Sequence, residues 1–178
     1  GTASDFTRLY AYTKLPEQRA GSEASWILRF SQVAFLAQMP HISLLDEAAR
    51  VKGSSLTDEE IRLLEERETY ALHWLSTYAP EAHQYRLQEK LPEGLELSPA
   101  QKSALLLLAE FIEEGERTGE ELHEKLHGLK SEVPIPPKEL FQALYRVFLN
   151  RDSGPKAGWF LSVLPREYVA RMLREASV

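Results

Sequence analysis

The segment PKELFQALYRVFLNRDSGPKAGWF, residues 137–160, carries the clearest structural signal in the chain. In its first part, apolar side chains recur at intervals of three and four residues, as one broad helix face requires. They are Leu140, Phe141, Leu144, Tyr145, Phe148 and Leu149. The pattern breaks at residues 151–160, which contain two glycines, one proline, two cations and two aromatic residues. Because glycine permits tight turns and Arg, Lys and Trp offer charge and a flat face, we expect a helix-to-helix connection suited to RNA.

Helix start signals recur along the rest of the chain, and strand signals do not. Thr57, Ser98 and Thr118 each stand three residues before Glu or Gln, the capping-box spacing that satisfies N–H groups at a helix start. Pro99 and Pro137 suit the first helical position, where no N–H is needed. Together with the apolar spacing, these signals predict helices near residues 24–38, 42–51, 58–78, 99–114, 119–131, 137–150, 157–163 and 166–176.

The 58–78 segment is predicted to bury its aromatic residues. Leu63, Tyr70, Trp74 and Tyr78 recur at the intervals of one helix face, so we expect them in the core. Arg67 lies between two glutamates, and we expect it to pair with carboxylates on a solvated face.

The long segment 80–97 contains Pro80, Pro92 and Gly94 and is predicted to link two helical sub-bundles, at about 5–79 and 98–178. We therefore expect residues 1–178 to form a single all-α domain, made of two packed helical sub-bundles.

Composition indicates a globular protein with a locally positive segment that could contact RNA. The chain has 178 residues, 43% of them hydrophobic, and no cysteine, which excludes disulfides and cysteine-based zinc sites. No apolar run approaches the length of about 20 residues of a membrane helix, so we expect a cytoplasmic protein that does not bind a membrane. The net charge is −6, but residues 129–178 contain 8 Lys or Arg against 5 Asp or Glu. A locally positive surface is what phosphate contacts need.

Catalytic motifs are scarce. His123, Glu124 and His127 match the His-Glu-x-x-His pattern of zinc peptidases, but no predicted strand flanks their helix and we expect surface histidines there. The sequence lacks both phosphate-binding glycine motifs, Gly-x-x-x-x-Gly-Lys-Ser/Thr and Gly-x-Gly-x-x-Gly. We therefore predict no catalytic residue, no metal ligand and no cofactor in this chain.

Three stretches of the sequence resemble the C-terminal, anticodon-binding domain of class I lysyl-tRNA synthetases. In that family a Phe-x-x-Leu/Ile-Tyr helix precedes a Gly-Pro-Arg/Lys-x-Gly turn, as residues 137–160 do here. The other two stretches are ERETYALHWL at 66–75, which continues to YAPE at 78–81, and the segment from Trp26 to Gln38. They follow the family's order and together cover most of the chain.

The resemblance implies a helical cage that takes the anticodon loop of lysine tRNA. It also implies a catalytic domain of the same parent protein, absent from this chain, which would use ATP and lysine; the fragment alone is then inactive as a ligase. RNA loops are recognised by stacked bases, with Lys and Arg on the phosphates. The residues that we expect to contact RNA are Arg29, Gln32, Gln38, Arg146, Arg151, Lys156, Trp159 and Phe160.

Two other functions remain open from the sequence. One is a helical protein-interaction module, in which the acidic helices between Thr57 and Glu121 dock a basic partner. It is motivated by residues 1–128, which contain 13 Lys or Arg against 22 Asp or Glu. The other is a zinc peptidase built on His123 and His127.

Overall fold

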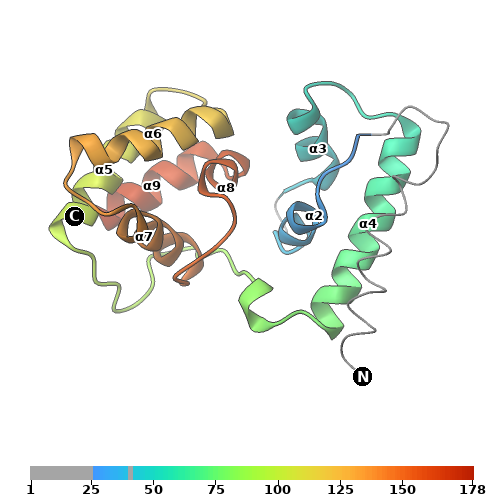
Figure 1. Cartoon of the computed structure of the whole chain (residues 1–178), viewed down its shortest axis with the longest axis horizontal. Coiled ribbons are helices and arrows are strands. Elements are labelled where there is room, and N and C mark those ends of the chain that lie inside the picture. Colours follow the sequence, from blue (N-terminus) through green and yellow to red (C-terminus); the bar gives the residue numbers. More distant parts are fainter. Residues whose placement is uncertain (1–25, 40–41) are drawn as a thin grey trace. The chain divides into compact units, whose positions relative to one another are not determined.

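The computed structural model describes residues 26–39 and 42–178. Over this part of the chain the regular structure is helical and no strand occurs, which confirms the all-α prediction (Figure 1). The chain divides into two compact units, residues 1–84 (unit 1) and 85–178 (unit 2). The division falls within the segment 80–97 that the sequence indicates as a link.

The described residues of unit 1 form three α-helices and one short 3-10 helix. They are α2 (Phe30–Leu36), α3 (Leu44–Lys52), α4 (Asp58–Thr77) and η1 (Glu81–His83). The long helix α4 begins after Thr57, whose hydroxyl accepts a hydrogen bond from the Glu60 N–H at 3.2 Å while the Glu60 carboxylate accepts from the Thr57 N–H at 2.7 Å. This reciprocal capping places the helix start where the sequence predicts it.

Helix α2 begins later than the sequence predicts. Residues 26–29 are not helical, and Arg29 is extended, with φ −61° and ψ 148°. The Arg29 N–H donates to Oε1 of Gln32 at 3.1 Å, so Gln32 caps the start of the helix. Residues 24 and 25 lie outside the described part of the chain.

The predicted buried face of α4 is wrong in part. Tyr70 is 51% exposed and Tyr78 is 63% exposed, whereas the buried positions are Glu60, Leu64 and Ala71. Intervals of three, four and seven residues fit two neighbouring stripes of a helix equally well. Spacing alone therefore misplaced the buried face by about one residue.

Arg67 also differs from its prediction. Its Nη1 donates to the backbone carbonyl of Leu28 at 2.6 Å, and burial lowers the pKa of the Arg67 guanidinium. The bond ties α4 to the extended segment before α2, so Arg67 supports the fold of unit 1, and no ion pair joins it to a carboxylate among the described residues.

Unit 2 contains five helices, which start where the sequence predicts them. They are α5 (Pro99–Glu113), α6 (Gly119–Glu132), α7 (Pro137–Leu149), α8 (Ala157–Val163) and α9 (Arg166–Ala176). Helix α5 packs on α9, and α6 packs on α8. The core includes the fully buried side chains of Leu108, Leu144, Phe148, Phe160 and Leu173.

Residues 85–97 belong to unit 2. The Gln88 N–H donates to the Phe148 carbonyl at 2.8 Å, and the Tyr168 hydroxyl donates to the Gln88 carbonyl. This segment therefore lies against α7 and α9. It has no regular helix or strand.

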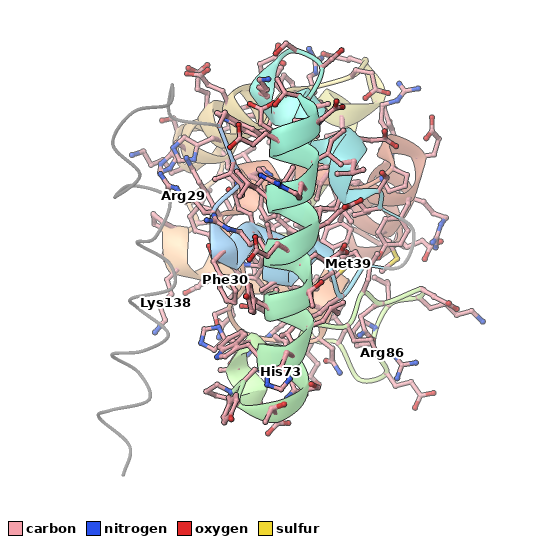
Figure 2. The ribbon with its side chains drawn as sticks, turned by 90° about the vertical axis from the view of Figure 1, so that its right-hand side faces the viewer. Arg29, Phe30, Met39, His73, Arg86 and Lys138 are labelled. Carbon is pink, nitrogen blue, oxygen red and sulfur yellow. The ribbon has the colours of Figure 1, made fainter. Side chains whose placement is uncertain are left out.

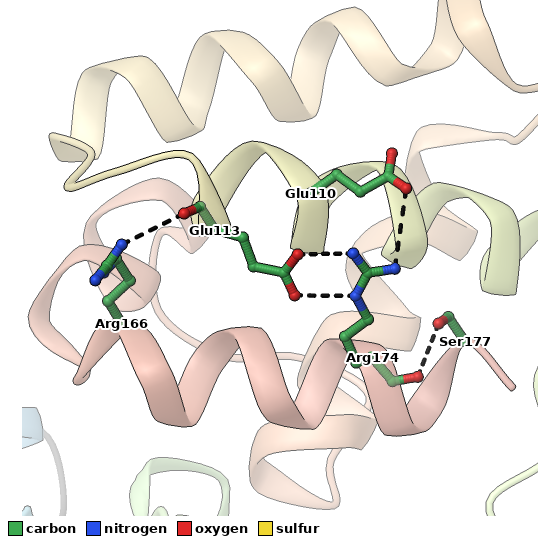
Figure 3. Close-up of polar contacts among 5 residues, drawn as sticks. All are labelled: Glu110, Glu113, Arg166, Arg174 and Ser177. Atoms are coloured by element: carbon green, nitrogen blue, oxygen red, sulfur yellow. Dashed lines mark hydrogen bonds and ion pairs between the residues drawn. The ribbon is translucent and has the colours of Figure 1, made fainter.

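Helices α5 and α9 are joined by a bidentate ion pair (Figure 3). Nε and Nη2 of Arg174 donate to the two carboxylate oxygens of Glu113 at 2.9 and 2.7 Å. Arg166 adds a longer bond, 3.4 Å, from Nη1 to the Glu113 carbonyl. Arg174 is thereby committed to carboxylates of α5.

Candidate nucleic-acid interface

The turn after α7 begins with a residue in the left-handed conformation. Asn150 has φ 52° and ψ 41°, and its N–H donates to the Arg146 carbonyl at 3.1 Å. Asn is one of the few residues other than Gly that tolerates this conformation at a helix end. The chain consequently reverses at Asn150 and folds back along the last turn of α7.

Tyr145 supports this turn from beneath. Its hydroxyl donates to the Pro155 carbonyl, and its ring lies so close to Gly154 that an added Cβ there would be 2.6 Å from Cδ1 of the ring. Burial, with a smaller effect from Tyr85, raises the pKa of Tyr145 to about 12. The hydroxyl thus remains a neutral donor at physiological pH, and the ring leaves no room for a side chain at Gly154.

The two aromatic residues of the turn have different environments. Phe160 is 0% exposed, and its ring packs on Phe148 and Tyr145 at centroid distances of 5.9 and 6.4 Å. It offers no face to a ligand here and acts as core beneath the turn, which removes it from the predicted contact residues. Trp159 is half-buried, and its carbonyl accepts from the Ser162 hydroxyl at 2.7 Å.

Three predicted cations lie on this turn or beside it. Lys156 is exposed and immediately precedes α8, while Arg151 is half-buried. Arg146 is 38% exposed and its Nε donates to Oδ1 of Asp152 at 2.7 Å. The structure therefore brings Arg146, Arg151, Lys156 and Trp159 onto one helix-to-helix connection of unit 2.

Close backbone packing fixes the start of α8. A Cβ at Gly158 would clash with the Gly119 carbonyl oxygen and would lie 2.9 Å from the backbone nitrogen of His123. Only glycine lets α8 approach the first turn of α6 so closely. The position of Lys156, two residues earlier, depends on this contact.

The remaining predicted residues belong to unit 1. Arg29 is exposed, and Figure 2 labels it in the extended segment before α2. Gln32 caps α2, as described above. Nε2 of Gln38 donates to the carbonyls of Ala34 and His83 at 3.0 and 3.1 Å. Both glutamines hold backbone in place, so Arg29 is the most accessible of the three.

The histidine pair of α6 does not extend to a metal site. The rings of His123 and His127 lie 4.3 Å apart, and the His127 ring is 6.2 Å from that of Phe141. In the described part of the chain, no group of three or more His, Cys, Asp or Glu could hold a metal ion. The third protein ligand that a zinc peptidase needs is therefore not supplied by the described residues.

Ion pairing determines which cations remain accessible. On α9, Arg166 pairs with Glu116 and Glu167, Arg171 with Glu175, and Arg174 with Glu110 and Glu113. On α7 and the turn that follows it, Arg146 is paired with Asp152, whereas Lys138 and Lys156 are exposed. Composition alone did not reveal this distribution, and it also missed Tyr145 as the support of the turn.

Within residues 26–39 and 42–178, no helix has both the length and the apolar character that a membrane span requires. A scan of the chain against models of protein families gives no match.

In a comparison with curated proteins, this chain is similar to lysine–tRNA ligases of several organisms. The lysine–tRNA ligase of Thermococcus kodakarensis is 36% identical over 168 residues, covering 90% of this chain and 31% of the relative. Lysine–tRNA ligase 1 of Methanosarcina acetivorans is 33% identical over 166 residues, covering 83% and 31%. The lysine–tRNA ligase of Pyrococcus furiosus is 35% identical over 151 residues, covering 82% and 29%. This chain thus spans about 31% of the length of these relatives, and it is homologous to archaeal class I lysyl-tRNA synthetases.

Proposed function

We propose that this chain is the anticodon-recognition domain of a class I lysine–tRNA ligase and binds the anticodon loop of lysine tRNA. The observation that carries the proposal is the turn at residues 150–160. It presents cations and a half-buried tryptophan on a backbone that Tyr145 and Gly158 hold in place. The homology to lysine–tRNA ligases supplies the class of RNA.

The turn suits a single-stranded RNA loop for electrostatic and geometric reasons. Lys156 and Arg151 are close in sequence and can neutralise neighbouring phosphates. Trp159 has an exposed portion at the start of α8, where an unstacked base could lie against it. Because Asn150, Tyr145 and Gly158 fix the backbone beforehand, little ordering of the turn is needed on binding.

Lysine activation belongs to a catalytic domain outside this chain in the proposed mechanism. That domain would use ATP and lysine, while the helical units position the tRNA. The described residues contribute binding and orientation, and no catalytic step is assigned to them.

The double substitution Arg151→Ala with Lys156→Ala tests the proposal. We expect weaker binding to the anticodon stem-loop of lysine tRNA. We also expect the slope of log affinity against log salt to fall by about 1.4, because each single-strand phosphate contact contributes about 0.7. Titration of labelled stem-loop at several salt concentrations measures both quantities.

The matched control is Lys90→Ala with Lys130→Ala, which removes the same charge from other exposed positions of unit 2. If both double variants weaken binding equally, net charge explains the result and the assignment of the turn fails. If neither changes affinity or slope, the turn does not contact RNA.

A second candidate is the protein-interaction module, and one observation favours it. Tyr70 and Leu72 on α4 and Tyr78 directly after it are exposed, and Figure 2 shows neighbouring His73 on the side of this helix that faces the viewer. A protein partner could cover these apolar side chains. Capture from lysate with and without nuclease separates the candidates, because an RNA-binding domain loses its bound material when RNA is destroyed.

A further inference from the structure

One side of helix α7 carries a row of polar side chains. Lys138, Gln142 and Arg146 are four residues apart, so they lie one above another along the helix. The opposite side of α7 is fixed in the core of unit 2 by Leu140, Leu144 and Phe148. The polar row must consequently point outward. Lys138 is exposed, and Gln142 and Arg146 are half-buried.

The row converges on a single carboxylate. Because the chain reverses at Asn150, Asp152 lies next to the end of α7, and Arg146 Nε donates to Asp152 Oδ1 at 2.7 Å. This bond is the largest cause of the lowered pKa of Asp152; burial opposes it, and smaller effects of Gln142 and Lys138 lower the pKa further. Arg146 is therefore paired with Asp152, and the other two members of the row favour the charged form of the same carboxylate.

An exposed carboxylate in this position resembles a phosphate oxygen in its interactions. Carboxylates and phosphates accept the same charge-assisted hydrogen bonds from Arg. Asp152 is 65% exposed, and an ion pair so open to water contributes little to stability. A phosphate arriving from solvent can replace it at small cost to the fold.

The size of the row also fits a nucleic-acid backbone. Eight residues separate Lys138 from Arg146, which corresponds to about 12 Å of helix. Consecutive phosphates along one strand of a DNA duplex rise about 3.4 Å each, so a row of this length spans about three such steps. It leads directly into the turn at residues 150–160.

We propose that Lys138, Gln142 and Arg146 form a binding strip for consecutive phosphates of an RNA backbone, and that Asp152 is a competing anion that a phosphate displaces from Arg146. The inference rests on the proposed RNA-binding function. It adds Lys138 and Gln142 to the interface and assigns Asp152 the role of limiting its affinity.

The substitution Asp152→Asn tests the strip directly. It keeps the size of the side chain but removes the charge that holds Arg146. We expect affinity for the lysine anticodon stem-loop to rise, by up to about five-fold at low salt, since an exposed ion pair is all that is lost. Lys138→Ala is expected to weaken binding. Circular dichroism and thermal melting establish that each variant stays folded.

The matched control is Glu175→Gln, which removes the same charge and releases Arg171 from a 3.2 Å pair on α9. Combining Asp152→Asn with Arg146→Ala supplies a second check. Without Arg146 there is no cation for Asp152 to release, so the gain in affinity for the stem-loop should shrink to that of the control. If Asp152→Asn binds like wild type, or gains no more than Glu175→Gln, the strip is overturned.

A second RNA distinguishes this inference from the proposed function. The same titrations are repeated with the stem-loop whose anticodon bases are exchanged. A gain from Asp152→Asn on both RNAs supports the strip even if the two RNAs bind equally, a result that would overturn anticodon recognition alone. Absence of binding to either RNA at low salt overturns both.

Discussion

At the residue scale, Tyr145 determines the shape of the proposed interface. It lies in the last turns of α7, donates to the Pro155 carbonyl and covers Gly154 with its ring. Its hydroxyl must be protonated to donate, and its buried position favours the protonated form. The tyrosine therefore links the ionisation of one group to the conformation of the turn.

This link predicts a loss of stability at alkaline pH. Burial raises the pKa of both Tyr145 and Tyr168 to about 12, from an ordinary value of 10.0. Above pH 10 the unfolded chain releases these protons while the folded chain retains them, so the free energy of unfolding falls as pH rises towards 12. Urea unfolding at a series of pH values measures this fall.

Tyr145→Phe isolates the contribution of one tyrosine. The variant loses a hydrogen bond worth about 1 kcal/mol at neutral pH, but its alkaline loss should be smaller than that of wild type because phenylalanine does not ionise. Equal alkaline losses in the two proteins would show that ionisation of Tyr145 is not coupled to folding.

At the scale of the elements, helix starts were more predictable than helix faces. Thr57, Ser98 and Thr118 cap their helices where the sequence places them, because a capping box is a local interaction. The start of α2 escaped prediction, since its cap is formed by Gln32 and the N–H of Arg29, which is not a standard capping residue.

Contacts between distant residues were the least predictable feature. The exposed side of α4 and the bond from Arg67 to Leu28 depend on how the helices pack against each other, which local sequence does not specify. In the candidate interface, the sequence identified Arg151, Lys156 and Trp159 as one turn. It could not show that Phe160 is buried against Phe148, or that Asp152 holds Arg146.

The close contact between Gly158 of α8 and Gly119 of α6 predicts a loss of stability when a side chain is added there. Gly158→Ala places a methyl group against the Gly119 carbonyl, and neither backbone can move without shifting a helix. We expect a destabilisation of about 1–3 kcal/mol, as for other overpacked sites. The change is measured by the midpoint of urea unfolding.

Gly128→Ala, on helix α6, is the matched control. Nothing lies within 4 Å of a Cβ at that position, so alanine should stabilise the chain by about 1 kcal/mol through helix propensity. If both alanine variants were stabilising, the close approach of α8 to α6 would be wrong.

At the scale of the whole molecule, neither unit is basic overall. Unit 2 contains 13 Lys or Arg against 15 Asp or Glu, and the described residues of unit 1 contain 5 against 9. Binding to RNA must then depend on where the cations lie and which are committed to carboxylates. Ion pairs occupy the arginines of α9, while Lys138 and Lys156 are exposed on α7 and its turn, so affinity should depend strongly on the local sequence of the turn.

Recognition of the anticodon is tested most directly by one comparison of RNAs. The chain is titrated with the anticodon stem-loop of lysine tRNA and with the same stem carrying exchanged anticodon bases, at low and moderate salt. Our account predicts tighter binding to the lysine loop, and a preference that persists at moderate salt because base contacts carry it. Equal affinity for the two loops would contradict anticodon recognition.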